Sequence, residues 1–228
     1  MKIVFLNTWN GKIQDKIAEF IKEQVNDTDI FCFQEVYAEM KIICKELLAD
    51  YVEISAYKFV IKNDDFPQAT YVRKNLNILS SEIIFDRDMD CGLGIYLQIK
   101  NADKNIHVCN FHGLSQPGHK LDNPNRLKQS RGLIDFFQGK KGAIVIGGDF
   151  NLFPETKSIQ MFEENGYGNL IKDYKIATTR NKFAWEMYPE SKQYYSDYIF
   201  ANGEVKVKNF LVPSIEVSDH LPLILDFE

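Results

Sequence analysis

Acidic, amide and imidazole side chains recur where apolar runs of this sequence end. A short polar string follows such a run at four places: LNTWN (6–10), FQEV (33–36), GGDFN (147–151) and VSDHLPL (217–223). Carboxylates bind hard divalent cations, amides donate hydrogen bonds to oxyanions, and an imidazole moves a proton or stabilises charge. Cleavage of a phosphoester with the help of a metal ion requires this set of groups, so the four strings predict such a site.

The string 147–151 places an acid, Asp149, two residues before an amide, Asn151, after the apolar run 143–146. Its two glycines let the backbone turn and approach other groups closely. If the chain stays extended, residues two apart point the same way, so Asp149 and Asn151 would face one point. Glycine, aspartate and asparagine also favour turns, so an ordinary turn is an equally good interpretation of this string alone.

The string Ser218-Asp219-His220 precedes the last apolar run of the chain. An acid next to a histidine suits a cation site with an imidazole beside the phosphate that is cleaved, although such a pair is more often polar surface. A serine-protease triad is disfavoured, because its members come from separate places and no Gly-x-Ser-x-Gly elbow is present.

Three single residues stand at the ends of apolar runs. Glu35, from the string 33–36, follows the run 30–34, His112 follows the run 106–111, and Asp197 opens the run 197–200. Asp197 would hold an imidazole in one tautomer and stabilise its charged form. Each residue alone is more often an ordinary strand-end group, because short motifs have high false-positive rates. Together, five strand ends with the same class of residue favour one shared site.

The hydrophobic pattern predicts many strands and few helices. Helical spacing of apolar residues predicts helices over 15–25, 39–48 and 156–164, and Asn123-Pro124 predicts the capped start of a helix that reaches about Phe137. Runs rich in Val, Ile, Phe and Tyr predict strands at 2–6, 29–33, 53–61, 76–85, 94–99, 106–111, 143–146, 197–200, 205–212 and 223–227. This order favours two packed sheets with helices on their outer faces.

Composition limits the alternatives. With 228 residues, 45% of them hydrophobic and 26% charged, the chain is expected to form a single globular domain over 1–228. Its net charge of −5 gives no general attraction to nucleic acid. No apolar run approaches the roughly 20 residues of a membrane span. The four cysteines form no Cys-x-x-Cys pair and are expected to be reduced core residues of a cytoplasmic protein.

The set Asn7, Gln34-Glu35, Gly-Asp-Phe-Asn and Ser-Asp-His, in this order and across nearly the whole chain, resembles the endonuclease/exonuclease/phosphatase superfamily, which includes DNase I. The resemblance implies a DNase I-like four-layer α/β sandwich, with mainly antiparallel sheets, and an active site at one end of them. It implies that Glu35 is the principal ligand of Mg²⁺ or Mn²⁺, with Asp219 and Asn7 nearby. It implies that three residues surround the scissile phosphate: His112, Asn151 and His220. Asp149 would orient or deprotonate the attacking water, and Asp197 would be the partner of His220.

Substrate choice is expected first in the segment 178–195, where aromatic residues alternate with Lys and Arg, as suits stacking on bases beside phosphate contacts, and otherwise in the segment 113–125, which holds His119 and Lys120. The alternative is a loop whose aromatics pack back on the sandwich. Four residues are the substrate-binding candidates: Asn10, Arg180, Trp185 and Tyr188. The sequence thus favours a phosphodiesterase acting on nucleic acid, as in end processing during DNA repair, and a monomer is assumed. The alternatives are hydrolysis of a small or lipid phosphoester and, less favoured, a binding module that has lost its chemistry.

Overall fold

Two six-stranded β-sheets form the centre of the structure, a computed structural model that describes residues 1–58 and 66–228. The first sheet has the strand order β11 (Val207–Leu211), β12 (Leu223–Phe227), β1 (Lys2–Asn7), β2 (Ile30–Gln34), β4 (Phe66–Arg73) and β3 (Tyr51–Lys58). The second has the order β5 (Asn77–Ile84), β6 (Leu93–Asn101), β7 (Lys104–His112), β8 (Ala143–Asp149), β10 (Asp197–Ala201) and β9 (Gly168–Asn169).

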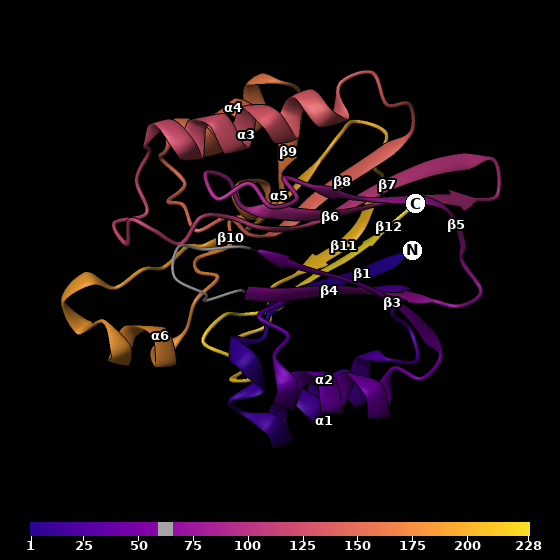
Figure 1. The fold of residues 1–228 in the computed structure, drawn as a ribbon, viewed down its shortest axis with the longest axis horizontal. Coiled ribbons are helices and arrows are strands. Elements are labelled where there is room, and N and C mark those ends of the chain that lie inside the picture. The colour runs from indigo at the N-terminus through magenta and orange to yellow at the C-terminus, as the bar shows by residue number, and fades with distance from the viewer. Residues whose placement is uncertain (59–65) are drawn as a thin grey trace.

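Helices cover the outer face of each sheet, so the molecule has four layers, as predicted (Figure 1). Helices α1 (Gln14–Gln24) and α2 (Ala38–Leu47) cover the first sheet, and α3 (Pro124–Phe137) and α4 (Lys157–Glu164) cover the second. The short helices α5 (Leu170–Asp173) and α6 (Lys182–Met187) lie in the connections, and α6 projects at the left end of Figure 1. The side chain of Asn123 accepts a hydrogen bond from Arg126 N at 2.9 Å, which is the predicted cap of α3.

Each sheet is mostly antiparallel but contains one parallel pair at its centre. β1 runs parallel to β2, with Asn7 opposite Gln34, and β7 runs parallel to β8, with His112 opposite Asp149. The two pairs face each other across the sandwich. Because parallel strands end at the same edge of their sheet, four strand ends meet at one end of the molecule. The neighbouring β10 runs the other way and begins there, with Asp197 opposite Asp149.

Burial on both faces explains why the central strands are continuous apolar runs rather than alternating ones. In β1, Ile3 and Phe5 pack between the two sheets, whereas Val4 and Leu6 pack in the cluster that includes Ile17 of α1. All four cysteines are free and buried, as expected for core residues.

The sequence prediction missed β4, a central strand of the first sheet. β4 begins with Phe66-Pro67, and a proline, which cannot donate to a sheet ladder, argues against an inner strand. Pro67 is tolerated because it stands at the start of the strand, opposite Tyr57 of the neighbouring β3. β3 covers 51–58, and the last part of the predicted strand, 59–61, lies outside the described residues.

A buried polar contact joins the sheets just below the four strand ends. The side-chain amide of Gln34 on β2 donates to Asn110 Oδ1 on β7 at 2.5 Å. Asn110 Nδ2 in turn donates to Thr70 Oγ1 and to the carbonyl oxygen of Ala69 on β4, both at 3.1 Å. The amide of Asn110 thereby fixes the position of the ends of the central strands of one sheet relative to those of the other.

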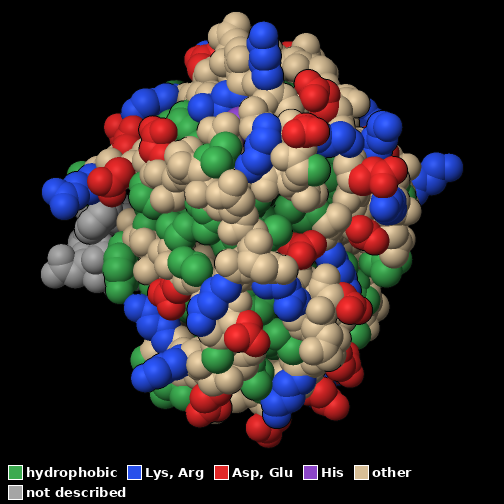
Figure 2. All heavy atoms as spheres, turned by 90° about the vertical axis from the view of Figure 1, so that its right-hand side faces the viewer, with side chains coloured by type: hydrophobic (Ala, Val, Ile, Leu, Met, Phe, Trp, Pro, Cys, Tyr) green, Lys and Arg blue, Asp and Glu red, His purple; other side chains and the backbone are tan. Residues whose placement is uncertain are grey.

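The two ends of the sandwich differ in chemical character. Both termini lie at the end opposite α6 (Figure 1), and Figure 2 views the molecule from that side. Basic and acidic side chains are interspersed there, with apolar side chains between them. None of the helices in the described ranges has the length and apolar character needed to span a bilayer.

Replacing Asn110 by alanine should destabilise the fold, because the buried amide of Gln34 would keep only its longer bond to Cys32 O, at 3.3 Å, and the bonds from Asn110 to Ala69 and Thr70 would be lost. Leaving buried polar groups unsatisfied costs about 1–3 kcal/mol each, so the free energy of unfolding should fall by at least about 2 kcal/mol in urea denaturation. Asn209→Ala, at an exposed position of β11, is the control and should stay within about 0.5 kcal/mol of the parent. Equal stability of the two variants would contradict the role given to Asn110.

Candidate active site

A cavity of about 550 Å³ opens at the end of the sandwich where β1, β2, β7 and β8 end, and we call it the strand-end cavity. Its size suits a small molecule or one segment of a larger substrate. Loops after these strands and the segment around α6 contribute the rest of its wall. Among its lining residues are Trp9, Lys12, Glu35, Phe66, His112, Lys120, Asp149, Asn151, Arg180, Tyr188, Asp219 and His220.

The backbone turns sharply at two of the strand ends. Glu35 and Asn151 adopt φ values of +58° and +57°, a left-handed conformation that is uncommon outside glycine and that collects at functional sites. Thr8 supports the first turn, since its hydroxyl donates to the carbonyl oxygens of Gln34 and Glu35, both at 2.9 Å. In the second, Asn151 N donates to Asp149 Oδ1 at 3.0 Å. The chain therefore does not stay extended from Asp149 to Asn151. The string 147–151 forms a turn, and the same turn places both residues in the lining of the strand-end cavity.

Asn7 joins the acids of the two sheets. Its side-chain Nδ2 donates to Glu35 Oε1 at 3.1 Å and to Asp149 Oδ2 at 3.0 Å. Its Oδ1 accepts a hydrogen bond from Trp9 N at 3.0 Å. The amide thus presents its N–H groups to the carboxylates. To serve as an oxygen ligand of a metal, the side-chain amide would have to rotate by about half a turn so that Oδ1 takes the place of Nδ2.

Glu35 feels the charge of two further acids, Asp149 and Asp219, and carboxylates are the groups that hold a hard divalent cation. Burial raises the pKa of Glu35, and the like charges of Asp219 and Asp149 raise it further, against the hydrogen bond from Asn7 and the charge of His220. A cation beside these oxygens would relieve the repulsion, and Mg²⁺ and Mn²⁺ prefer oxygen ligands of this type. Arg180 Nη2 holds Asp219 Oδ2 at 2.7 Å.

His220 is held in one orientation by Asp197. Its Nδ1 lies 2.9 and 3.0 Å from the two carboxylate oxygens of Asp197, and its Nε2 lies 3.8 Å from Asp149 Oδ2. Burial and Arg180 lower the pKa of His220, but Asp197, Asp219 and Asp149 outweigh them and raise it to about 9. The imidazole is therefore charged at neutral pH, so it can stabilise negative charge or give a proton.

Ligand atoms of Asp149, Asp197 and His220 also lie within 4.8 Å of one another, which is close enough for a metal site. The short contacts between Asp197 and Nδ1 of His220 explain this cluster better as a carboxylate–imidazole pair beside Asp149. In the part of the chain that the structure describes, Glu35 and Asp219 belong to no such cluster, and ligand chemistry alone favours them, because hard cations prefer carboxylates whereas zinc prefers imidazole.

His112 and Asp149 have opposite electrostatic behaviour although their side chains are close. Burial and the nearby Lys58 lower the pKa of His112 well below its usual value, so its imidazole is neutral. Burial raises the pKa of Asp149, but His220, His112 and Lys120 hold it below its ordinary range. Asp149 is thus a stable anion that accepts hydrogen bonds.

The model of the endonuclease/exonuclease/phosphatase family matches residues 5–220. The chain belongs to this family. Its members are phosphoric ester hydrolases, such as nucleases and phosphatases, and depend on divalent metal ions. The sequence resemblance and the sandwich fold inferred from it are confirmed.

Solved structures share this family fold along the whole chain at low sequence identity. A family member from Bacteroides vulgatus superposes with a TM-score of 0.78 at 18% identity, covering 100% of this chain and 98% of the other. A mannosyl-6-phosphatase from Bacteroides thetaiotaomicron gives 0.76 at 17%, covering 100% and 99%. Truncated TDP2 from Caenorhabditis elegans gives 0.73 at 18%, covering 99% and 96%. No curated protein matches the chain in sequence.

Two buried lysines lie at or beside the strand-end cavity: Lys120 lines it, whereas Lys58 is not among its lining residues. Lys58 was not predicted, and Lys120 belongs to the segment 113–125, the second place in which substrate choice was expected. Lys58 Nζ donates to the carbonyl oxygen of Gly113 at 2.9 Å, and Lys120 Nζ donates to Asn151 Oδ1. Burial lowers the pKa of Lys58 to about 7 and that of Lys120 to about 8, although Asp149 acts in the opposite direction on both. The position of Lys58 at the end of β3 is the one sequence signal that Lys58 carries.

The four predicted substrate-binding residues have different surroundings. Arg180 lines the strand-end cavity and is nearly buried by its ion pair with Asp219, and Tyr188 lines it with 58% of its surface exposed. Trp185 is outside the cavity lining: its Nε1 donates to Gln193 O at 3.0 Å and its ring packs on Tyr194. Asn10 lies in the short turn after β1 and is outside the cavity lining. Trp9 and Lys12, which lie in or next to the same turn, line the cavity.

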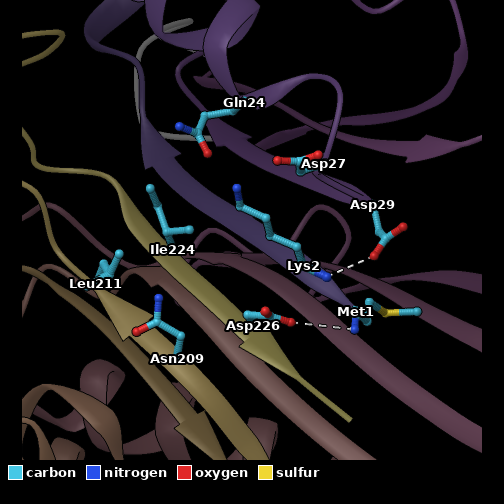
Figure 3. A pocket seen from close by; sticks show the side chains of 9 residues that line it. All are labelled: Met1, Lys2, Gln24, Asp27, Asp29, Asn209, Leu211, Ile224 and Asp226. Carbon is cyan, nitrogen blue, oxygen red and sulfur yellow. Dashed lines mark hydrogen bonds and ion pairs between the residues drawn. The ribbon is translucent and has the colours of Figure 1, made fainter.

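A second pocket lies at the opposite end of β1 (Figure 3). The N-terminal ammonium group lies 3.8 Å from Asp226 Oδ1, and the backbone N–H of Lys2 donates to Asp29 at 2.8 Å. Two of its acidic groups therefore interact with the chain's own N-terminal residues. The acids, imidazoles and amides that suit phosphoester chemistry are instead those of the strand-end cavity.

Asp197→Asn should leave the fold intact and reduce turnover, because an amide cannot hold the charged form of His220 as a carboxylate does. Losing such a positioning partner typically costs about 10–100-fold, here expected in kcat with little change in KM. Steady-state kinetics with Asp103→Asn, in the exposed turn between β6 and β7, as control would measure this. Unchanged turnover in Asp197→Asn would reduce Asp197 to a residue that only begins a strand.

Proposed function

We propose that this protein is a Mg²⁺-dependent phosphodiesterase that cleaves its substrate by in-line attack of water, at a nucleic-acid end or in a nucleotide-linked adduct. The observation that carries the proposal is the convergence of five strand ends on the strand-end cavity. They bring Glu35, His112, Asp149, Asp197 and His220 together from positions far apart in the sequence. A cytoplasmic location accords with the four free, buried cysteines.

Asp149 and Asn151 would act on the water and the phosphate. Because Asp149 stays ionised and has low proton affinity, it orients the attacking water by accepting its hydrogen bond. Asn151, which follows in the same turn, donates one side-chain N–H to the carbonyl oxygen of Gly113 at 3.4 Å, and its second side-chain N–H would serve the negative charge that develops on a phosphate oxygen. Its Oδ1 is occupied by Lys120, which directs Nδ2 to the other side.

The two histidines would have different tasks because their charges differ. Neutral His112 can donate one hydrogen bond to a phosphate oxygen without adding charge. Charged His220, held by Asp197, can stabilise the transition state and give its Nε2 proton to the leaving oxygen. The protein thereby provides the proton that the departing alkoxide requires.

Glu35 and Asp219 are the residues that would hold Mg²⁺ or Mn²⁺, together with Asn7 if its side-chain amide rotates so that Oδ1 faces the cation. Such a cation supplies Lewis-acid stabilisation of negative charge on the phosphoryl group. The repulsion that raises the pKa of Glu35 favours occupation by a cation.

The nucleic-acid assignment is supported by the aromatic wall of the strand-end cavity. Tyr188 is largely exposed on it, and Trp9 faces it with Lys12 Nζ 4.1 Å from its ring centroid. Exposed rings beside a cation suit bases that stack next to a phosphate. The structural similarity to TDP2 accords with this substrate class.

A second candidate function is hydrolysis of a small phosphoester, as the name of the similar mannosyl-6-phosphatase indicates for that protein. The observation in its favour is Lys120, which lines the cavity, donates to Asn151 Oδ1 and adds positive charge where a compact phosphate would lie. The net charge of −5 also gives a long nucleic acid no general attraction.

Chelation of divalent ions should abolish phosphodiester hydrolysis, and Mg²⁺ should restore it. Glu35→Gln should lower metal affinity, measured by calorimetry, together with activity, because it removes the charge of the principal ligand. Glu39→Gln, in the exposed first turn of α2, is the matched control and should behave like the parent. Full activity in excess chelator would overturn the proposed mechanism.

Tyr188→Ala should lower kcat/KM on single-stranded oligonucleotides about tenfold or more, since stacking one base on an aromatic ring contributes roughly 1–3 kcal/mol. Hydrolysis of a small chromogenic phosphodiester should scarcely change. Trp185→Ala, whose ring packs inside the loop, should affect both substrates equally if at all. An unchanged preference in Tyr188→Ala would remove the support that the aromatic wall gives to a nucleic-acid substrate.

A further inference from the structure

A fully buried serine contacts Asp149 from within the protein. Ser196 immediately precedes β10, has no exposed surface and is not among the residues that line the strand-end cavity. Its hydroxyl donates a hydrogen bond to Asp149 Oδ1 at 2.5 Å. Ser196 therefore touches the acid of the proposed reaction without reaching a substrate in the cavity.

The backbone of Ser196 is fixed on both sides. Its carbonyl oxygen accepts from Phe150 N at 2.8 Å and from Asn151 N at 3.2 Å, which continues the pairing of β8 with β10 beyond the end of β8. Its N–H donates to Thr179 Oγ1 at 3.0 Å. The hydroxyl thus starts from a fixed position, and its single proton is committed to Asp149.

The two carboxylate oxygens of Asp149 have different surroundings. Oδ1 accepts from Ser196 Oγ and from Asn151 N, and these two donors fill the two lone pairs of that oxygen. Oδ2 accepts from Asn7 Nδ2 at 3.0 Å. Within the ranges 1–58 and 66–228, no second N–H or O–H group donates to Oδ2, so one of its acceptor positions is open.

The oxygen with the open position is also the one beside the imidazoles. The Nε2 atoms of His112 and His220 each lie 3.8 Å from Asp149 Oδ2. These distances are too long for a hydrogen bond, so neither ring fills the open position. Because both imidazoles are proposed to act on the phosphate, Oδ2 is the oxygen beside the reacting groups, and Oδ1 is the one that the protein anchors.

We propose that Ser196 is a positioning residue, which anchors Oδ1 of Asp149 so that Oδ2 accepts the hydrogen bond of the attacking water. This inference rests on the proposed function and adds the group that orients its acid. Without the hydroxyl, Oδ1 would keep only its bond from Asn151 N. The terminal torsion of an aspartate is broadly distributed, so the carboxylate plane would tilt and the water would lose its direction for in-line attack.

Ser196→Ala, assayed on bis(p-nitrophenyl) phosphate with Mg²⁺, tests the inference. We expect kcat to fall about 10–100-fold, since a small misplacement of a reacting group can cost about this much. KM should stay close to the value of the parent, because Ser196 does not line the cavity.

Ser158→Ala is a matched control. Ser158 is equally buried, and its hydroxyl donates to Asp122 Oδ1, also at 2.5 Å. Neither of these two residues lines the strand-end cavity. Both alanine variants should lose a similar amount of stability in urea denaturation, but Ser158→Ala should keep the kcat of the parent.

The same serine substitution in an Asp149→Asn background shows whether Ser196 acts through this acid. The further loss of kcat should largely disappear there, because the carboxylate that Ser196 orients is absent. A crystal structure of Ser196→Ala should show the carboxylate of Asp149 turned from its position in the parent.

Equal kcat in Ser196→Ala and Ser158→Ala, an equal loss with and without the Asp149 carboxylate, or an unmoved carboxylate would overturn the role of Ser196. Each of these results would leave the proposed function standing. Absence of metal-dependent hydrolysis in the parent would instead defeat the proposed function.

Discussion

The hydrogen bond between Gln34 and Asn110 is the contact on which the active end of the molecule depends. It joins the two sheets at Gln34, the last residue of β2 before Glu35, and at Asn110, two residues before His112 at the end of β7. The hydrophobic core fixes the distance between the sheets, but apolar packing is not directional. A buried polar contact is directional, because any shift that breaks it leaves an amide unsatisfied. The relative position of the strand ends, and hence of the proposed catalytic groups, follows from it.

The parallel pairs turn this alignment into a site. In each sheet, two strands end at the same edge, so residues separated by more than 25 positions become neighbours without long loops. The turns that follow place charged and amide groups in left-handed conformations, at Glu35 and at Asn151. The buried surroundings then give the two histidines different charges. Three carboxylates keep His220 protonated, while burial and the nearby Lys58 keep His112 neutral.

Much of this arrangement follows from the sequence, because apolar runs fix where strands end and the polar strings lie at those ends. The capped start of α3 and the layer order could be predicted in the same way. Three features could not. β4 was concealed by Pro67, Trp185 packs within its own loop, and Lys58, at the end of β3, donates to the carbonyl oxygen of Gly113 without any motif that announces it. Their positions depend on tertiary packing, which local patterns do not encode.

The central claim is that these strand ends form one divalent-metal site in which Glu35 is the principal ligand. A crystal structure with bound Mn²⁺, located by its anomalous scattering, tests this most directly. We expect the anomalous peak within bonding distance of a Glu35 carboxylate oxygen, on the side of Asp219. A peak coordinated instead by Asp197 and His220, with Glu35 still bound only by Asn7, would contradict the account.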